Sequence, residues 1–191
     1  MASAIEALLK EHDEKPQEIG PSTMRTVSQA VEFLTLLFDH VSSFPSSSAT
    51  EPAEFKILVV DDEILSRRAV TKALERAQLN AVAVDSPFAA YELLQLERFD
   101  LVVTDVKMPG MDGFELCAKL RALPAHAATP VVFVTSSNGF EARVRSAKSG
   151  GDDFIAKPFL FIELAVKALT HVVRGQLKNS RTGFQSFHPN A

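Results

Sequence analysis

Residues 101–113 read LVVTDVKMPGMDG, an apolar run that ends in one aspartate and leads into a turn rich in glycine and proline. A run that is apolar at nearly every position predicts a strand buried on both faces, as in a parallel sheet covered by helices. Asp105 stands where this strand ends, and a helix is expected to begin near Phe114. The stretch therefore favours an open α/β fold.

The same alternation extends along the chain on both sides of this stretch. Short apolar runs predict five strands, at residues 57–60, 81–84, 101–104, 131–134 and 154–156. Segments with helical periodicity lie between or after them, at residues 64–77, 88–96, 114–123, 140–147 and 160–173. Five strand–helix units predict a parallel sheet with helices on both faces.

Composition divides the chain into four parts. We expect a helical extension at residues 1–42, a Ser/Pro-rich linker at 43–54, the α/β domain at 55–175 and a flexible polar tail at 176–191. The extension carries an apolar stripe with steps of three and four residues, at Met24, Val27, Val31, Leu34, Phe38 and Val41. Such spacing is typical of a helix–helix seam. Two partners remain open for it: the chain's own domain, or a second copy in a homodimer through residues 22–42.

Charge and cysteine content narrow the functional classes. The net charge of −4 argues against a nucleic-acid binder. No stretch has the roughly 20 apolar residues that a membrane span needs, and no cleavable signal pattern is present. Cys117 is the only cysteine, which rules out an intramolecular disulfide. The expected compartment is therefore the reducing cytoplasm.

Polar side chains directly follow four of the predicted strands. Asp61 and Asp62 follow the first, Asp105 the third, Thr135 the fourth and Lys157 the fifth. Because the carboxyl ends of parallel strands share one edge of the sheet, these groups are expected to meet there. Close carboxylates repel one another unless a cation lies among them, and hard oxygen ligands suit Mg²⁺. A carboxylate can also act as a nucleophile and form an aspartyl phosphate, which needs mainly positioning and charge neutralisation.

Four motifs carry a resemblance to a known family. They are ILVVDDE at residues 57–63, LVVTDVKMPGMDG at 101–113, VTS at 134–136 and DDFIAKPF at 152–159. In order and spacing they resemble the receiver domain of two-component response regulators, the fold of the bacterial chemotaxis switch. The resemblance covers residues 55–175 and implies a flavodoxin-like sheet in the strand order 2-1-3-4-5, flanked by five helices.

The resemblance implies a phosphoacceptor and a metal site. Asp105 is the expected phosphoacceptor. The expected Mg²⁺ ligands are Asp61, Asp62, Asp105 and the backbone carbonyl of Lys107, with Asp62 the more direct carboxylate of the first pair.

Further roles follow from the same resemblance. Lys157 and Thr135 are expected to bind the phosphoryl group, and Phe154 matches the aromatic residue whose rotation accompanies phosphorylation. Lys107 and Ser137 occupy positions that are expected to tune dephosphorylation.

The implied function is phosphorelay signalling. A histidine kinase or histidine phosphotransfer protein, docking over the first helix, is the expected donor, and the switched domain is expected to control a partner protein. Such a domain is a signalling switch and not an enzyme, since it catalyses only its own Mg²⁺-dependent phosphorylation and dephosphorylation. No DNA-binding output domain is expected, since no basic recognition helix is evident.

Other interpretations account for the residues less well. A phosphatase of the haloacid dehalogenase type carries its nucleophile on the first strand and a second aspartate two residues later, where this chain has Lys107. A pseudo-receiver without chemistry has no reason to keep the complete set of acidic, threonine and lysine residues. Structural roles are expected for four more residues: Asp112 and Gly113 as cap and turn of the next helix, and Asp152 and Asp153 as turn residues. Cys117 and the histidines show no metal-like spacing.

Overall fold

The computed structural model describes residues 24–32, 55–136, 145 and 148–185, with side chains described as far as residue 175. Its strands and helices from residue 55 onward are β1 (Lys56–Val60), α3 (Ile64–Arg76), β2 (Asn80–Val84), α4 (Pro87–Leu96), β3 (Leu101–Asp105), α5 (Gly113–Arg121), β4 (Val131–Thr135), β5 (Asp153–Ala156) and α7 (Phe161–Gln185). The predicted alternation of strands and helices is confirmed.

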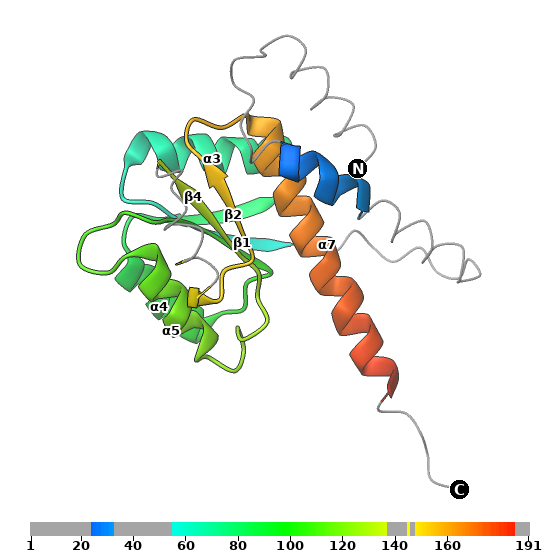
Figure 1. Cartoon of the computed structure of the whole chain (residues 1–191). Coiled ribbons are helices and arrows are strands. Elements are labelled where there is room, and N and C mark those ends of the chain that lie inside the picture. Colours follow the sequence, from blue (N-terminus) through cyan, green and yellow to red (C-terminus); the bar gives the residue numbers. More distant parts are fainter. Residues whose placement is uncertain (1–23, 33–54, 137–144, 146–147, 186–191) are drawn as a thin grey trace, which may run out of the picture.

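The five strands form one parallel sheet in the order β2-β1-β3-β4-β5 (Figure 1). This is the predicted order. In the register, Val60 lies beside Thr104, Asp105 beside Val134, and Thr135 beside Ala156. The carboxyl ends of β1, β3, β4 and β5 therefore lie at one edge, as a site built from strand ends requires.

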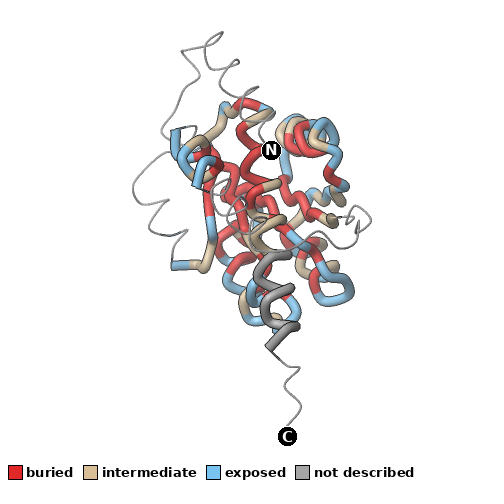
Figure 2. Tube along the Cα trace, turned by 90° about the vertical axis from the view of Figure 1, so that its right-hand side faces the viewer, coloured by how far each residue is buried: buried red, intermediate tan, exposed pale blue. Residues whose placement is uncertain are grey.

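Each face of the sheet has its own apolar core, because successive side chains of a strand point to opposite faces. On one face, Leu58, Val102 and Phe133 belong to a cluster with residues of α4 and α5. On the other, Val59, Val103 and Val132 pack with residues of α3 and α7. Figure 2 shows the buried residues running through the centre of the molecule between these layers.

The helix predicted at residues 140–147 falls almost entirely outside the described residues. Residue 145 and residues 148–149 are helical. The predicted linker at 43–54 also lies outside the described part of the chain.

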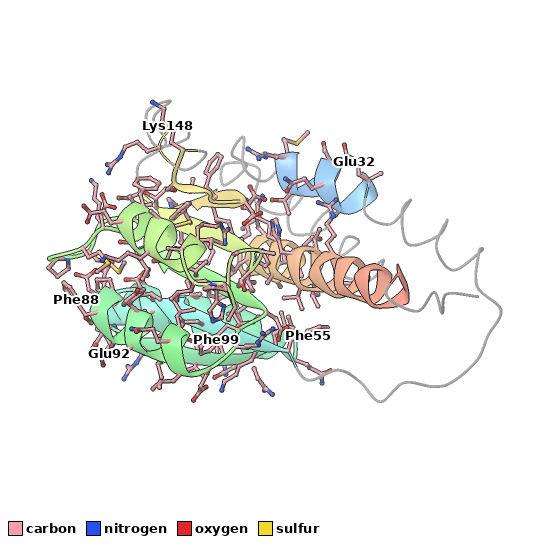
Figure 3. All side chains as sticks on the ribbon, turned by 90° about the horizontal axis from the view of Figure 1, so that it is seen from below. Glu32, Phe55, Phe88, Glu92, Phe99 and Lys148 are labelled. Carbon is pink, nitrogen blue, oxygen red and sulfur yellow. The ribbon has the colours of Figure 1, made fainter. Side chains whose placement is uncertain are left out.

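Residues 24–32 form a helix that lies alongside α7 (Figures 1 and 3). Two residues of the predicted seam are exposed there, Met24 at 56% and Val31 at 52%, and Val27 is half-buried, whereas Thr26 is 1% and Ala30 0% exposed. The helical prediction is confirmed for these nine residues, but the fully buried positions are Thr26 and Ala30 and not the predicted seam. The rest of the predicted seam, Leu34, Phe38 and Val41, lies outside the described residues.

The last helix is longer than predicted. The sequence predicted its end near Val173 and a flexible tail from residue 176, but α7 continues to Gln185. The prediction failed because the residues after Val173 lack an apolar period, although Arg174, Gln176, Leu177 and Lys178 have high intrinsic helix propensity. Among the helices that the structure describes, none has the length and apolarity to cross a bilayer.

Candidate phosphoacceptor and metal site

Three carboxylates meet at the carboxyl edge of the sheet. Asp61 and Asp62 directly follow β1, and Asp105 is the last residue of β3. One oxygen from each of the three lies within 4.8 Å of the other two. Asp61 and Asp105 are buried at 2% and 9% exposure, while Asp62 is exposed. An exposed carboxylate above two buried ones leaves an open approach for a cation.

Lys157 joins two of these carboxylates. It follows β5, and its ammonium lies 3.0 Å from Asp61 Oδ2 and 3.2 Å from Asp105 Oδ1. Its backbone N–H donates to the Thr135 carbonyl at 2.8 Å, which ties the lysine to the end of β4. The Lys157–Pro158 peptide bond is cis. The predicted lysine therefore lies beside the predicted phosphoacceptor.

Burial and the neighbouring Lys157 ammonium shift the pKa of Asp105 in opposite directions. Desolvation raises the pKa of its carboxyl, the Lys157 ammonium lowers it, and the nearby Asp61 raises it again; the net shift is upward. Burial alone would lower the pKa of Lys157, but Asp61 and Asp105 raise it overall. Lys157 thus stays protonated at neutral pH, while the Asp105 carboxylate is left undercompensated. Additional positive charge is favoured at this edge.

The first turn of α3 holds Asp61 in place. The Asp61 carboxylate accepts hydrogen bonds from the Glu63 N–H at 2.9 Å and from Ser66 Oγ at 2.5 Å. Arg67 Nη1 donates to the Asp61 carbonyl at 2.6 Å. The N-cap of α3 is Glu63, which makes no side-chain cap bond. Asp61 is therefore anchored on one side and faces Asp105 on the other.

Ser66 and Arg67 were not predicted as site residues. Both lie four to six residues after the Asp61–Asp62 pair in sequence. A polar first turn directly after a predicted acidic strand end is the signal that could have identified them, because side chains there can reach back to the strand end.

The loop after β3 confirms the structural prediction for Asp112 and Gly113. Asp112 caps α5, and its side chain forms a capping box with Glu115. Gly113 is required for space: a Cβ there would lie 2.1 Å from the Asp105 carbonyl oxygen. The start of α5 is therefore packed directly against the backbone of Asp105.

Lys107 reaches the site through its backbone. Its N–H donates to Asp105 Oδ2 at 3.2 Å, and the residue is exposed. Thr135 ends β4 and is 2% exposed. Phe154 lies in β5 at 9% exposure, packed with the core on the α4–α5 face of the sheet. Ser137 lies outside the described residues.

Asp153 is not the turn residue that the sequence suggested. It begins β5, is 2% exposed and lies 2.6 Å from the Lys167 ammonium. Asp152, in the loop before β5, accepts hydrogen bonds from the Val131 N–H and from Arg121. The Asp153 prediction failed because its partner Lys167 comes from α7, and a local pattern cannot reveal that contact.

Three labelled phenylalanines show where the site lies in the molecule, because one follows a strand and two precede strands. Figure 3 shows Phe88, which follows β2, at the left of the view, and Phe99 and Phe55, which precede β3 and β1, further to the right. The acidic cluster belongs to the first of these sides.

Comparison with known proteins agrees with this geometry. The family model for the response regulator receiver domain matches residues 57–169. The transcriptional activator protein IrlR of Burkholderia pseudomallei is 34% identical over 125 residues, which are 65% of this chain and 53% of that protein. This chain therefore spans about half the length of the curated relatives that it matches.

Solved structures are similar over the same region. The chemotaxis response regulator CheY4 of Vibrio cholerae has 30% identity and a TM-score of 0.58, covering 63% of this chain and 99% of that one. A putative response regulator from Chloroflexus aurantiacus has 25% identity and a TM-score of 0.62, covering 64% and 100%. Since the family model matches more than half of the chain, and the predicted sheet order and acidic edge are both present, the chain belongs to the response regulator receiver family.

Proposed function

We propose that this chain is a phosphorylation-driven switch that accepts a phosphoryl group on Asp105. The observation that carries the proposal is the position of the Lys157 ammonium, 3.2 Å from Asp105 and 3.0 Å from Asp61, beside three converging carboxylates. A nucleophilic carboxylate, a fixed cation and a cluster of oxygen ligands are what phosphoryl transfer requires.

In the proposed reaction, a carboxylate oxygen of Asp105 attacks the phosphorus of a phosphohistidine. The new P–O bond forms as the P–N bond breaks, and the electron pair leaves on the imidazole nitrogen of the donor. Lys157 and the Thr135 hydroxyl are proposed to bind the phosphoryl oxygens. This chemistry is limited to the domain's own phosphorylation and dephosphorylation.

The donor set fits Mg²⁺, because it consists of hard oxygens with one exposed side for water ligands. The proposed ligands are Asp61, Asp62, Asp105 and the Lys107 carbonyl. Bound there, Mg²⁺ would neutralise charge on the phosphoryl oxygens. Asp61 already accepts three hydrogen bonds from its surroundings, which favours Asp62 and Asp105 as the direct carboxylate ligands.

The test is phosphorylation by acetyl phosphate with Mg²⁺, followed by intact mass. One phosphoryl group is expected on the wild type and none on Asp105→Asn. Asp85→Asn is the matched control, because Asp85 is an exposed aspartate that follows β2 at the same edge of the sheet. Labelling that persists in Asp105→Asn would refute the assignment.

The proposed donor is a histidine kinase or histidine phosphotransfer protein that docks over the start of α3. Ile64 is 52% and Leu65 70% exposed there, two and three residues after Asp62. Leu65→Ala is expected to slow transfer from a phosphohistidine protein and to leave the reaction with acetyl phosphate unchanged. Leu96→Ala, at the far end of α4 and 81% exposed, is the control. Equal effects of the two variants would contradict docking at α3.

The output is proposed to be control of a partner protein in the cytoplasm. IrlR is named a transcriptional activator, but this chain matches only about half of that protein, so the type of output is not carried over from it.

We also propose a homodimer through residues 22–42, supported by the exposure of Met24 and Val31. Light scattering of the full chain at micromolar concentration should give a dimeric mass that Val31→Asp reduces; a monomeric wild type would refute it.

A further inference from the structure

The helix at residues 24–32 contacts α7 through polar groups. Thr26 Oγ1 donates to Glu163 Oε1 at 3.4 Å, and the Lys167 ammonium donates to Gln29 Oε1 at 3.3 Å. Arg174 donates to the Gln29 backbone carbonyl at 3.4 Å. Glu163, Lys167 and Arg174 are spaced by four and seven residues and so share one side of α7. The short helix thus runs along that side.

The same helix contacts β5 through one residue. The Arg25 guanidinium lies over the Phe154 ring, with its central carbon 5.5 Å from the ring centroid. One of its nitrogens is 3.8 Å from Asp153 Oδ1. Asp153, Phe154, Glu163, Lys167 and Arg174 together form what we call the β5–α7 face.

The part of the β5–α7 face that the helix at residues 24–32 covers carries charged side chains. Lys167 is 1% and Glu163 1% exposed, and Asp153 is paired with both Lys167 and His171. Buried charges are costly unless they are paired and hydrogen-bonded. Gln29 supplies a second acceptor to the buried ammonium, in addition to Asp153. Because water can replace these polar contacts, the helix can leave this face at lower cost than an apolar helix could.

Strand β5 connects this face to the phosphoacceptor. Phe154, which Arg25 covers, is three residues before Lys157, whose ammonium lies 3.2 Å from Asp105. Attraction of Lys157 to a phosphoryl group, or reorientation of Phe154, changes the surface that Arg25 contacts. The helix is docked on an arrangement in which both oxygens of the free Asp105 carboxylate are engaged by the protein, Oδ1 by the Lys157 ammonium and Oδ2 by the Lys107 N–H.

We propose that the helix at residues 24–32 is a built-in occupant of the β5–α7 face, which binds the unphosphorylated domain and is released when Asp105 is phosphorylated. Arg25 is the positioning residue that couples the two events, through Phe154 and Asp153. Release frees the β5–α7 face for a partner protein. The inference rests on the proposed function of Asp105.

Thermodynamic linkage makes the coupling reciprocal. If phosphorylation weakens docking, removal of the docking contacts must strengthen the phosphorylated arrangement by the same factor. Arg25→Ala is therefore expected to raise the affinity for beryllofluoride, a phosphoryl mimic, by a factor in the usual range of roughly 5–150 for coupled sites. Arg98→Ala, an exposed arginine at the opposite edge of the sheet, is the matched control and should leave the affinity unchanged.

Hydrogen exchange of the full chain tests release directly. Amides of residues 24–32 should be protected in the apo protein and lose protection with beryllofluoride and Mg²⁺; Arg25→Ala should show the lower protection without the ligand. Protection that is the same with and without bound beryllofluoride, or an unchanged affinity in Arg25→Ala, would overturn the inference. Loss of this protection in the monomeric Val31→Asp variant would assign the docking to a second copy and overturn it as well.

Fluorine NMR of bound beryllofluoride separates this failure from a failure of the proposed function. A bound signal with unchanged protection of residues 24–32 refutes only the helix coupling. Absence of a bound signal in the wild type refutes the phosphoacceptor site and the inference with it.

Discussion

At the scale of single residues, the site depends on how closely the backbone around Asp105 is packed. The N–H of Gly113 donates to the Val106 carbonyl, and the N–H of Lys107 donates to the Asp105 carboxylate. These bonds orient the Asp105 carboxylate from the loop side, while Lys157 orients it from the end of β5. The proposed nucleophile is thus held by backbone contacts that a side-chain inventory does not reveal.

Gly113→Ala should therefore disturb both stability and the site. Its new Cβ would lie 2.1 Å from the Asp105 carbonyl oxygen, so α5 or the end of β3 must shift. Overpacking of this kind costs about 1–3 kcal/mol, and phosphorylation by acetyl phosphate should slow as well. The control is Gly175→Ala in α7, where a Cβ meets nothing within 4 Å; it should stabilise the helix by about 0.5–1 kcal/mol. Thermal unfolding of both variants checks this, and a neutral Gly113→Ala would refute it.

A second prediction at this scale concerns the lifetime of the aspartyl phosphate. Lys107 is two residues after the acceptor, and its long stem and ammonium can cover a phosphoryl group against an in-line water. We expect a long-lived phosphorylated state, and faster decay in Lys107→Asn than in the wild type with Mg²⁺ present. Loss of phosphoprotein over time is the measurement. Equal or slower decay in the variant would make the Lys107 side chain a bystander.

At the scale of elements, β5 and α7 are joined by a buried ion pair. The side chains of Asp153 and Lys167 are 0% and 1% exposed and lie 2.6 Å apart. Burial alone would raise the pKa of Asp153, but hydrogen bonds from His171 and Lys167 hold it well below its usual range. Burial lowers the pKa of Lys167, although Asp153 opposes that shift.

Asp153→Asn should destabilise the domain, because it leaves the buried Lys167 ammonium without its carboxylate. Breaking one side of a buried pair costs about 3–5 kcal/mol. Urea unfolding at neutral pH measures the change, with Asp85→Asn as the exposed control. A smaller loss of unfolding free energy than in the control would contradict this, and would show that the hydrogen bond to Gln29 is sufficient for the Lys167 ammonium.

The same pair predicts how stability depends on pH. The folded pKa of Asp153 is lower than its unfolded pKa, which is near 3.8, so the folded state binds fewer protons in that window. Its contribution is fully present above the unfolded pKa and is lost as the pH falls towards the folded pKa. The wild type should therefore lose more stability than Asp153→Asn on going below about pH 4.

At the scale of the whole molecule, the site collects groups from four strands. Asp61 and Lys157 touch at 3.0 Å although 96 residues separate them in sequence. A ligand that bridges these strand ends stabilises the entire sheet and not one element, since it binds only the folded arrangement.

Mg²⁺ should accordingly raise the melting temperature. A ligand at one hundred times its Kd adds about 2.7 kcal/mol to the free energy of unfolding. Asp62→Ala should abolish this shift, and without Mg²⁺ it should be at least as stable as the wild type, because it relieves repulsion among the three carboxylates. A titration of Tm against Mg²⁺, with Asp85→Ala as control, tests both. A full shift in Asp62→Ala would remove Asp62 from the metal site.

Sequence alone was sufficient for the parallel sheet and the acidic edge, and the family resemblance of the four motifs implied the strand order. Continuous apolar runs such as LVVTD can only be buried on both faces, and the residues after them must then gather at one edge. Local hydrophobic periodicity and the four motifs in register therefore led to Asp61, Asp62, Asp105 and Lys157 before any contact was known.

Only the tertiary structure decided which side of the N-terminal helix is buried. Met24 and Val31, two residues of the predicted seam, are exposed, while Thr26 and Ala30 are buried and Thr26 contacts Glu163 of α7. Polar burial depends on partners, and the partners Glu163 and Lys167 are more than 130 residues away in sequence. The same reason hid the role of Asp153, because the charge that stabilises a buried carboxylate comes from another element of the fold.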